Sequence, residues 1–142
     1  MILLPPSARA LLESDALAHL ATIGGTGAPQ VTCIWVGLDR DEIVSAHLSA
    51  AQKKLENVRR DPRVTLSLES PVVNARGLKE YLVIHGTAVL EPGGAPELLQ
   101  KLAHVYLGPE VRFPPMDDPP AGHVMRITPI RIGGVGPWLE GR

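Results

Sequence analysis

The sequence predicts a mainly β fold, a small antiparallel barrel of six strands with two to three helices. Six segments rich in β-forming residues follow one another, and most of them are separated by short turns. Two helical patterns interrupt this series, but strands and long helices do not alternate as they do in a doubly wound parallel sheet. Because 142 residues suffice for one hydrophobic core but not for two, residues 1–142 are expected to form a single domain.

The first third of the chain is expected to form a helix and a three-stranded meander. The helix opens at Pro6-Ser7, where proline suits the first turn, and apolar residues continue the pattern as far as Leu17. Glycines at 24–27 and the segment Leu38-Asp-Arg-Asp41 predict two turns. The strands are therefore expected at residues 20–23, 30–36 and 42–47.

A second helix is expected over residues 50–60. Ser49 and Gln52 have the spacing of a capping box, which makes Ser49 the expected N-cap. Ala51, Leu55 and Val58 fall on one helix face, and the helix ends before the proline that follows Asp61.

Lys53 and Lys54 lie in the first turn of this predicted helix. The positive end of a helix disfavours cations but favours anions, so two lysines beside free backbone N–H groups form a plausible phosphate site. The alternative is that both lysines are simply solvated on an exposed face.

The rest of the chain is expected to form three strands, a helix and a long loop. In the strand at 79–90, Leu82 and Ile84 alternate with more polar residues, which indicates one buried face. The proline-rich segment 109–120 is either a stiff surface loop or the rim of a pocket. The other elements are strands at 63–68 and 124–128 and a helix at 96–107.

Composition and motif content exclude several classes of function. A net charge of −1, with no aromatic platform near the basic residues, argues against nucleic-acid binding. No apolar run approaches the roughly 18 residues of a membrane span, and no signal peptide is visible, so a cytoplasmic location is expected. The five histidines lack ligand spacing, so no metal site is expected, and Cys33 is the single cysteine. No nucleophile motif occurs, so an enzyme of this sequence would rely on a cofactor.

The two tryptophans call for separate interpretations. Trp35 lies within a predicted strand and is expected in the core or at an interface that closes the barrel. Trp138 follows the last predicted strand. A large aromatic side chain stabilises a protein only when it is buried. Trp138 is therefore expected to dock on its own barrel, on a partner subunit or on a flat ligand ring.

Several motifs resemble those of the pyridoxamine-5′-phosphate-oxidase-like split-barrel family. They are Leu20-Ala-Thr-Ile before a glycine turn, Ala28-Pro-Gln-Val-Thr with Trp35, and Lys54-x-x-Asn57-x-Arg59-Arg60-Asp61-Pro62-Arg63-Val64. The similarity covers almost the whole chain and is strongest to the actinobacterial branch described as probable F420-dependent (deazaflavin) enzymes. It implies a six-stranded Greek-key barrel that forms a homodimer, with a flavin or deazaflavin in each of two interface grooves.

The resemblance also implies roles for particular residues. Lys54 would hold the cofactor phosphate, and Trp138 would reach the ring edge from the partner subunit. Trp35 and Trp138 would line the substrate pocket. The strand Val31, Thr32 and Cys33 would run along the ring system, and the other cofactor contacts would be His47, Leu48, Ser49, Gln52, Lys53 and Asn57.

The chain departs from its relatives at two of these positions. Relatives often carry arginine in place of Gln52, where Lys53 can substitute for the charge, and proline in place of Cys33. The basic residues near the C-terminus that a pyridoxal-phosphate substrate would need are not evident, which argues against a true pyridoxamine-phosphate oxidase.

The sequence therefore predicts a homodimeric oxidoreductase that transfers hydride from reduced coenzyme F420 to a small, apolar, conjugated molecule. One alternative is an FMN-dependent oxidoreductase of the same fold. The other is a protein that binds flavin, deazaflavin or haem without turnover.

Overall fold

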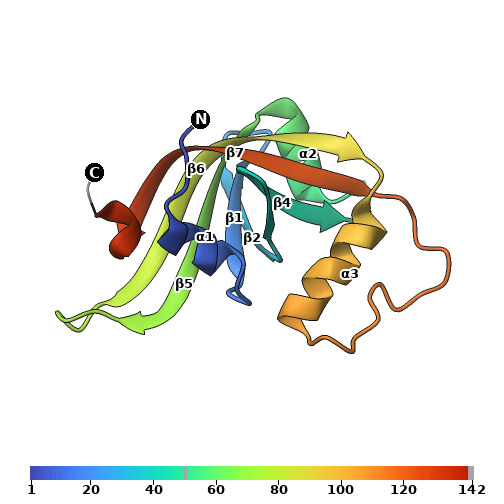
Figure 1. Ribbon diagram of the computed structural model, residues 1–142. Coiled ribbons are helices and arrows are strands. Elements are labelled where there is room, and N and C mark those ends of the chain that lie inside the picture. The colour runs from blue at the N-terminus through green and yellow to red at the C-terminus, as the bar shows by residue number, and fades with distance from the viewer. Residues whose placement is uncertain (50, 141–142) are drawn as a thin grey trace.

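The computed structural model describes residues 1–49 and 51–140 and has a mainly β architecture with one antiparallel sheet of seven strands (Figure 1). This confirms the predicted split-barrel class, although the strand count is seven rather than six. The additional strand is β3, which pairs with β4 and was expected to be a turn. The elements in chain order are α1 (Pro6–Leu12), β1 (Ala18–Ile23), β2 (Pro29–Ile34), β3 (Gly37–Asp39), β4 (Glu42–His47), α2 (Lys53–Arg60), β5 (Arg63–Val73), β6 (Lys79–Pro92), α3 (Ala95–Tyr106), β7 (His123–Val135) and the 3-10 helix η1 (Pro137–Leu139).

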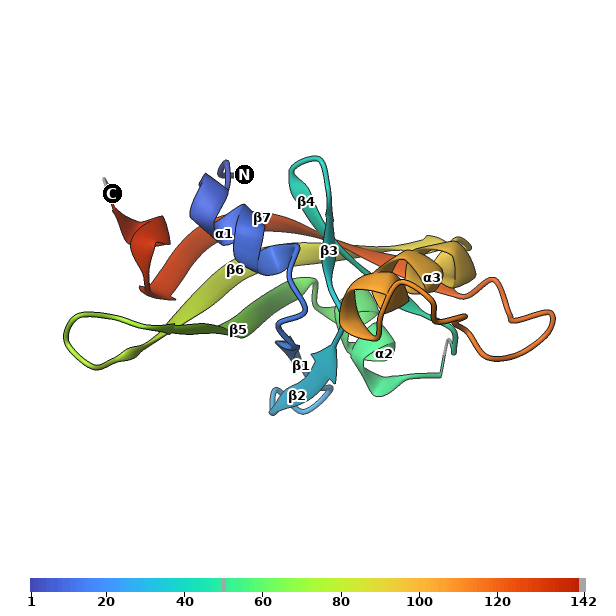
Figure 2. The ribbon, with the colours of Figure 1, turned by 60° about the horizontal axis from the view of Figure 1, so that its bottom comes forward.

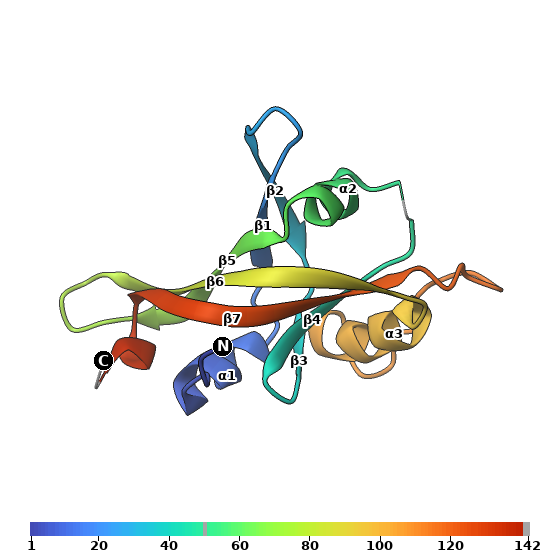
Figure 3. The same ribbon diagram turned by 90° about the horizontal axis from the view of Figure 1, so that it is seen from above.

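The strands are ordered β2-β1-β5-β6-β7-β4-β3, so β2 and β3 are the two edges of the sheet. β1 pairs with β5, and β4 pairs with β7. These paired strands are not consecutive in the sequence, as in a Greek key. Seen from above, β5, β6 and β7 run side by side, with the β1–β2 hairpin on one side and β3–β4 on the other (Figure 3). The barrel is therefore open along a seam between β2 and β4, which are not paired with each other.

The expected alternation along β6 is confirmed. Leu82, Ile84 and Ala88 are buried in the core. Gly86 continues this inward face where β6 shifts register against β7, and a Cβ there would lie 2.5 Å from the carbonyl oxygen of Thr128. Glycine is needed at this position because the two backbones approach too closely for a side chain.

Helix α2 begins later than predicted, and the capping assignment was wrong. The N-cap is Gln52, which makes no side-chain capping bond, and the helix starts at Lys53. The Ser49 hydroxyl instead accepts a hydrogen bond from the backbone N–H of Ala51 at 3.3 Å. The predicted start at residue 50 lies outside the described residues, but Leu55 and Val58 are buried as expected.

Several strands and one helix differ in length from the prediction. β7 runs to Val135 because its glycine-rich end pairs with β6, although glycine gives no strand signal in sequence. β5 likewise continues to Val73, past an irregularity in its pairing with β6. Helix α1 ends at Leu12, so Leu17 belongs to the connection before β1.

The proline-rich loop leaves α3 and returns to β7 along the outside of the molecule (Figure 2). Gln100 on α3 holds it with two hydrogen bonds, donating to the carbonyl oxygen of Val111 at 2.8 Å and accepting from the N–H of Phe113 at 3.1 Å. This part of the chain is therefore fixed to α3. Among the described helices, none is long and apolar enough to span a membrane.

Candidate functional site

A cavity of about 250 Å³ lies at the open seam of the barrel, between the end of β2 and β4. We call it the seam cavity. It brings together five of the residues predicted to contact a cofactor or substrate, namely Cys33, Trp35, His47, Gln52 and Lys54. Its other lining residues are Leu17, Ile34, Ala46, Leu99 and Phe113. The lining therefore has a polar part, which we call the polar wall, and an apolar and aromatic part, which we call the aromatic wall.

The polar wall is suited to an anion. Lys54 is half-buried, and burial lowers the pKa of its ammonium group. No ion pair to Lys54 occurs among residues 1–49 and 51–140, and the first turn of α2 has no side-chain cap. A half-buried cation beside free helix N–H groups is stabilised by a negatively charged ligand.

Lys53 does not share this position. Its side chain is exposed, and its Nζ lies 3.5 Å from a carboxylate oxygen of Glu56. Lys53 is thus a solvated lysine, as the alternative interpretation stated, whereas Lys54 faces the cavity.

His47 is part of the polar wall and is hydrogen-bonded on both ring nitrogens. Its Nε2 lies 2.8 Å from Ser45 Oγ, and its Nδ1 lies 3.1 Å from Gln52 Oε1. Burial, with a smaller contribution from the charge of Lys54, lowers the pKa of His47 to about 4. The imidazole is therefore neutral at neutral pH.

Two aromatic side chains of the cavity lining, Trp35 and Phe113, belong to a cluster of three rings. Trp35 stacks on Tyr106 with ring centroids 5.4 Å apart and contacts Phe113 at 5.1 Å. The Tyr106 hydroxyl donates to the carbonyl oxygen of Ala16 at 2.9 Å and accepts from the N–H of Val36 at 3.1 Å, which fixes the stack. The loop at 109–120 thus forms a rim of the pocket through Phe113, although sequence reasoning did not identify Phe113 or Tyr106.

Asn57 has a structural role, which corrects its assignment as a cofactor contact. It is fully buried, and its amide nitrogen donates to Thr22 Oγ1 at 3.0 Å and Gln30 Oε1 at 2.7 Å. Its oxygen accepts from Arg60 at 2.9 Å. Asn57 therefore connects α2 to the β1–β2 hairpin and has no surface left for a ligand.

The remaining predicted contacts do not line the seam cavity. Val31 is exposed on the outer face of β2, and Thr32 points to the other face, where its hydroxyl oxygen is buried without a hydrogen bond. Leu48 and Ser49 belong to the segment between β4 and α2 and are also outside the lining. That these four residues contact a cofactor therefore remains a prediction.

Trp138 docks on its own chain. It is 3 % exposed, packs in the core cluster, and donates from Nε1 to the carbonyl oxygen of Gly133 at 3.2 Å. A side chain at Gly136 would collide with the indole. Trp138 borders a groove of about 860 Å³ beside α1 rather than the seam cavity, so within one chain it does not form a pocket with Trp35.

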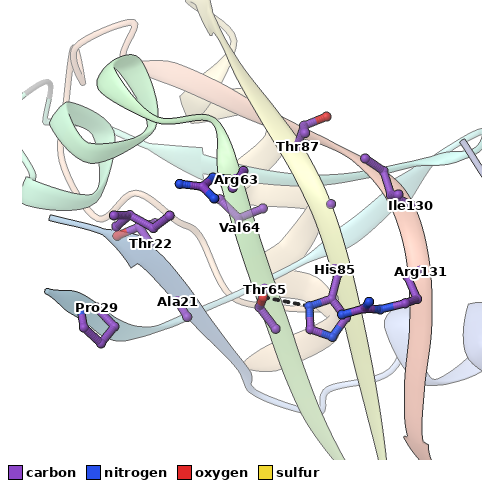
Figure 4. A pocket seen from close by; sticks show the side chains of 12 residues that line it. Ala21, Thr22, Pro29, Arg63, Val64, Thr65, His85, Thr87, Ile130 and Arg131 are labelled. Atoms are coloured by element: carbon purple, nitrogen blue, oxygen red, sulfur yellow. Dashed lines mark hydrogen bonds between the residues drawn. The ribbon is translucent and has the colours of Figure 1, made fainter. Parts of the chain in front are cut away.

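A third groove, of about 690 Å³, lies on the outer face of the sheet (Figure 4). Side chains from β1, β5, β6 and β7 line it, and Thr65 and His85 are hydrogen-bonded at 3.1 Å between neighbouring strands. Burial and the nearby Arg131 lower the pKa of His85. None of the predicted cofactor contacts lines this groove, and the described residues contain no cluster suited to a metal ion.

Comparison with known proteins gives a consistent set of relatives. The family model described as pyridoxamine 5′-phosphate oxidase matches residues 4–136. A solved F420 reductase is 26 % identical, with a TM-score of 0.74, covering 91 % of this chain and 98 % of that chain. A conserved hypothetical protein of Mycobacterium tuberculosis is 24 % identical (TM-score 0.69, coverage 94 % and 85 %). An FMN-binding protein of Syntrophomonas wolfei is 13 % identical (TM-score 0.64, coverage 91 % and 84 %) and shares the fold.

Proposed function

Because the chain belongs to the pyridoxamine 5′-phosphate oxidase family, we propose that it is an oxidoreductase that binds coenzyme F420 at the seam cavity and reduces a small, apolar, conjugated substrate. The family and the likeness to an F420 reductase support the coarser assignment, a flavin- or F420-binding protein of the oxidoreductase type. The observation that carries the finer proposal is the seam cavity itself, which Lys54 lines together with Trp35 and Phe113.

The residues present fit such a cofactor. Lys54 is a half-buried cation that a phosphodiester would neutralise, and the uncapped first turn of α2 offers N–H donors to the same group. When bound, reduced F420 supplies the hydride. The protein would contribute binding and orientation: Cys33 of β2 would line the ring's site, and the aromatic wall would exclude water.

We also propose that the protein acts as a homodimer. A volume of about 250 Å³ is below the roughly 300–1,000 Å³ of sites for ligands of this size, so much of the cofactor must lie outside the seam cavity. The outer face of the sheet carries the apolar groove of Figure 4 and exposes Val31, Val89 and Ile130. A second copy that covers this face would bury these side chains and enclose the rest of the cofactor.

Parallel titrations test the choice of cofactor. Purified protein is titrated with F420, FMN and haem, and binding is followed by fluorescence or absorbance at low and high salt. We expect F420 to bind most tightly, by a modest and salt-sensitive margin, because its acidic tail adds contacts to exposed cations worth only about 0.2–1 kcal/mol each. FMN as the tightest ligand at both salt concentrations supports the flavin enzyme. Tight binding without oxidation of the reduced cofactor by any conjugated acceptor supports the carrier.

A pair of neighbouring variants tests the seam cavity. Lys54→Ala should weaken F420 binding by about 1.5–3 kcal/mol, the range for a hydrogen bond to a charged group. Lys53→Ala is the matched control, because it removes the same charge one residue away from a side chain that pairs with Glu56 in solvent. Equal losses in the two variants would show that general electrostatic attraction, and not the cavity, holds the phosphate.

A further inference from the structure

Ser45, His47 and Gln52 form a hydrogen-bonded chain that leads from the core to the seam cavity. Ser45 is fully buried and His47 is 4 % exposed, and both His47 and Gln52 line the cavity. The two links measure 2.8 Å between Ser45 Oγ and His47 Nε2 and 3.1 Å between His47 Nδ1 and Gln52 Oε1. β4 carries Ser45 and His47, and Gln52 caps α2, so the chain connects two elements at the seam.

The placement of the Gln52 amide, with Oε1 toward His47, sets the direction of both links. The Gln52 amide oxygen can only accept, so His47 Nδ1 carries the hydrogen. A neutral imidazole has a single N–H, and its Nε2 therefore accepts the hydroxyl hydrogen of Ser45. Both ring nitrogens are satisfied, and the ring cannot turn over without losing both bonds.

In this arrangement the nitrogen end of the Gln52 amide is the end left for a ligand. His47 occupies the oxygen, and the amide nitrogen makes no hydrogen bond to any of the described residues. Gln52 and Lys54 line the same cavity. The free end of the amide is thus a donor beside a cation, and both favour an anionic oxygen.

We propose that His47 is a positioning residue that orients the Gln52 amide so that it donates, together with Lys54, to a phosphate oxygen of the cofactor. This inference rests on the proposed function, since it assigns the contact that recognises the cofactor's phosphate. Without His47, the amide of Gln52 would be free to present its oxygen to the phosphate and repel it.

Two polar variants of similar size separate this role from simple packing. In His47→Asn the side-chain amide nitrogen is placed near the position of Nδ1 and can still donate to Gln52. In His47→Gln it is placed near the position of Nε2, on the side of Ser45, and the donor to Gln52 is lost. A third variant, Gln52→Glu, keeps the acceptor for His47 but replaces the donor by a negative charge.

The measurement is the ratio of two dissociation constants, those of F420 and of the deazaflavin ring compound that lacks the phosphodiester tail, obtained by fluorescence titration at pH 7. Thermal unfolding confirms that each variant is folded. His47→Gln and Gln52→Glu should each reduce the preference for F420 about tenfold or more, the equivalent of one charge-assisted hydrogen bond, and should leave the tail-less ring unaffected. His47→Asn should stay within about threefold of the wild type.

The outcomes distinguish the two proposals. If the wild type binds neither ligand, the proposed function fails. If it binds F420 but His47→Gln keeps the wild-type ratio, or loses affinity for both ligands equally, His47 does not orient Gln52 and this inference alone is overturned. Should His47→Gln not fold, an unchanged ratio in Gln52→Glu would overturn the inference just as directly, because the carboxylate cannot donate.

Discussion

Replacement of His47 by asparagine should make the stability of the protein less dependent on pH between 4 and 7. His47 is almost completely buried, and burial together with the charge of Lys54 lowers its pKa from 6.5 to about 4. In the unfolded chain the imidazole returns to its ordinary pKa. The unfolded state therefore binds more protons than the folded state within this interval.

The sign and size follow from this difference. Because protons bind preferentially to the unfolded state, the free energy of unfolding falls as the pH decreases. The contribution of His47 is complete above about pH 6.5 and is lost progressively as the pH falls through 6.5 towards 4. The difference between the pKa of His47 in the unfolded and in the folded state corresponds to about 3 kcal/mol of unfolding free energy, which is a large part of the stability of a small domain.

Other titrating groups do not obscure the effect. Hydrogen bonds from Arg63 lower the pKa of Asp61 to about 2, so Asp61 titrates at lower pH. Hydrogen bonding and the charge of Arg126 also lower the pKa of Asp39. The pKa of His85 is lowered by burial, but His85 is present in both proteins, and its contribution cancels when the variant is compared with the wild type.

The assay is urea unfolding of wild type and His47→Asn at several pH values from 4.5 to 7.5, at one fixed protein concentration so that any dimerisation contributes equally. Asparagine does not titrate, so the wild type should lose about 2–3 kcal/mol more than the variant over this range. Parallel curves for the two proteins would refute the reasoning, because they would show that His47 does not enter the core in its neutral form.

Three further predictions concern packing and assembly. Asn57→Ala should destabilise the protein by about 2–4 kcal/mol in chemical unfolding, because it leaves buried partners such as Thr22 without their hydrogen bond. Weaker cofactor binding at unchanged stability would instead show that Asn57 contacts the cofactor. Trp138→Ala should cost about 3 kcal/mol, as for a buried aromatic side chain, and Trp138→Phe much less; unchanged stability with weaker cofactor binding would instead place this ring at a partner's site. Light scattering at micromolar concentration should give twice the 15.2 kDa monomer mass, and a monomer mass with and without cofactor would exclude the dimer.

The class of fold could be predicted because its signals are local. Alternation in β6 and the order of strands and helices are written in neighbouring residues, and both were confirmed. Errors occurred where pairing with distant residues overrides a local signal. β7 continues through Gly133 and Gly134 because β6 supplies partners for them, and Ser49 does not cap α2 although it has the spacing of a capping residue.

The site was predictable only in part, for the same reason. The position of Lys54 in the first turn of a helix indicated an anion site, and the structure places it on the polar wall of the seam cavity. Sequence could not separate Lys54 from Lys53, because adjacent residues on a helix point about 100° apart and only the packed partner shows which one faces inward. Asn57 belongs to the same motif, but its burial depends on Thr22 and Gln30 of another hairpin.

The sequence by itself therefore determined the antiparallel barrel and the helix that carries the lysines. Only the tertiary structure decided that Cys33 and His47 meet across an unpaired seam, that Phe113 from a distant loop completes the aromatic wall, and that Trp138 folds back onto its own core. The physical reason is that periodicity and turn chemistry act between neighbours along the chain. A cavity, by contrast, is defined by side chains that are far apart in sequence and that only the closure of the barrel brings into contact.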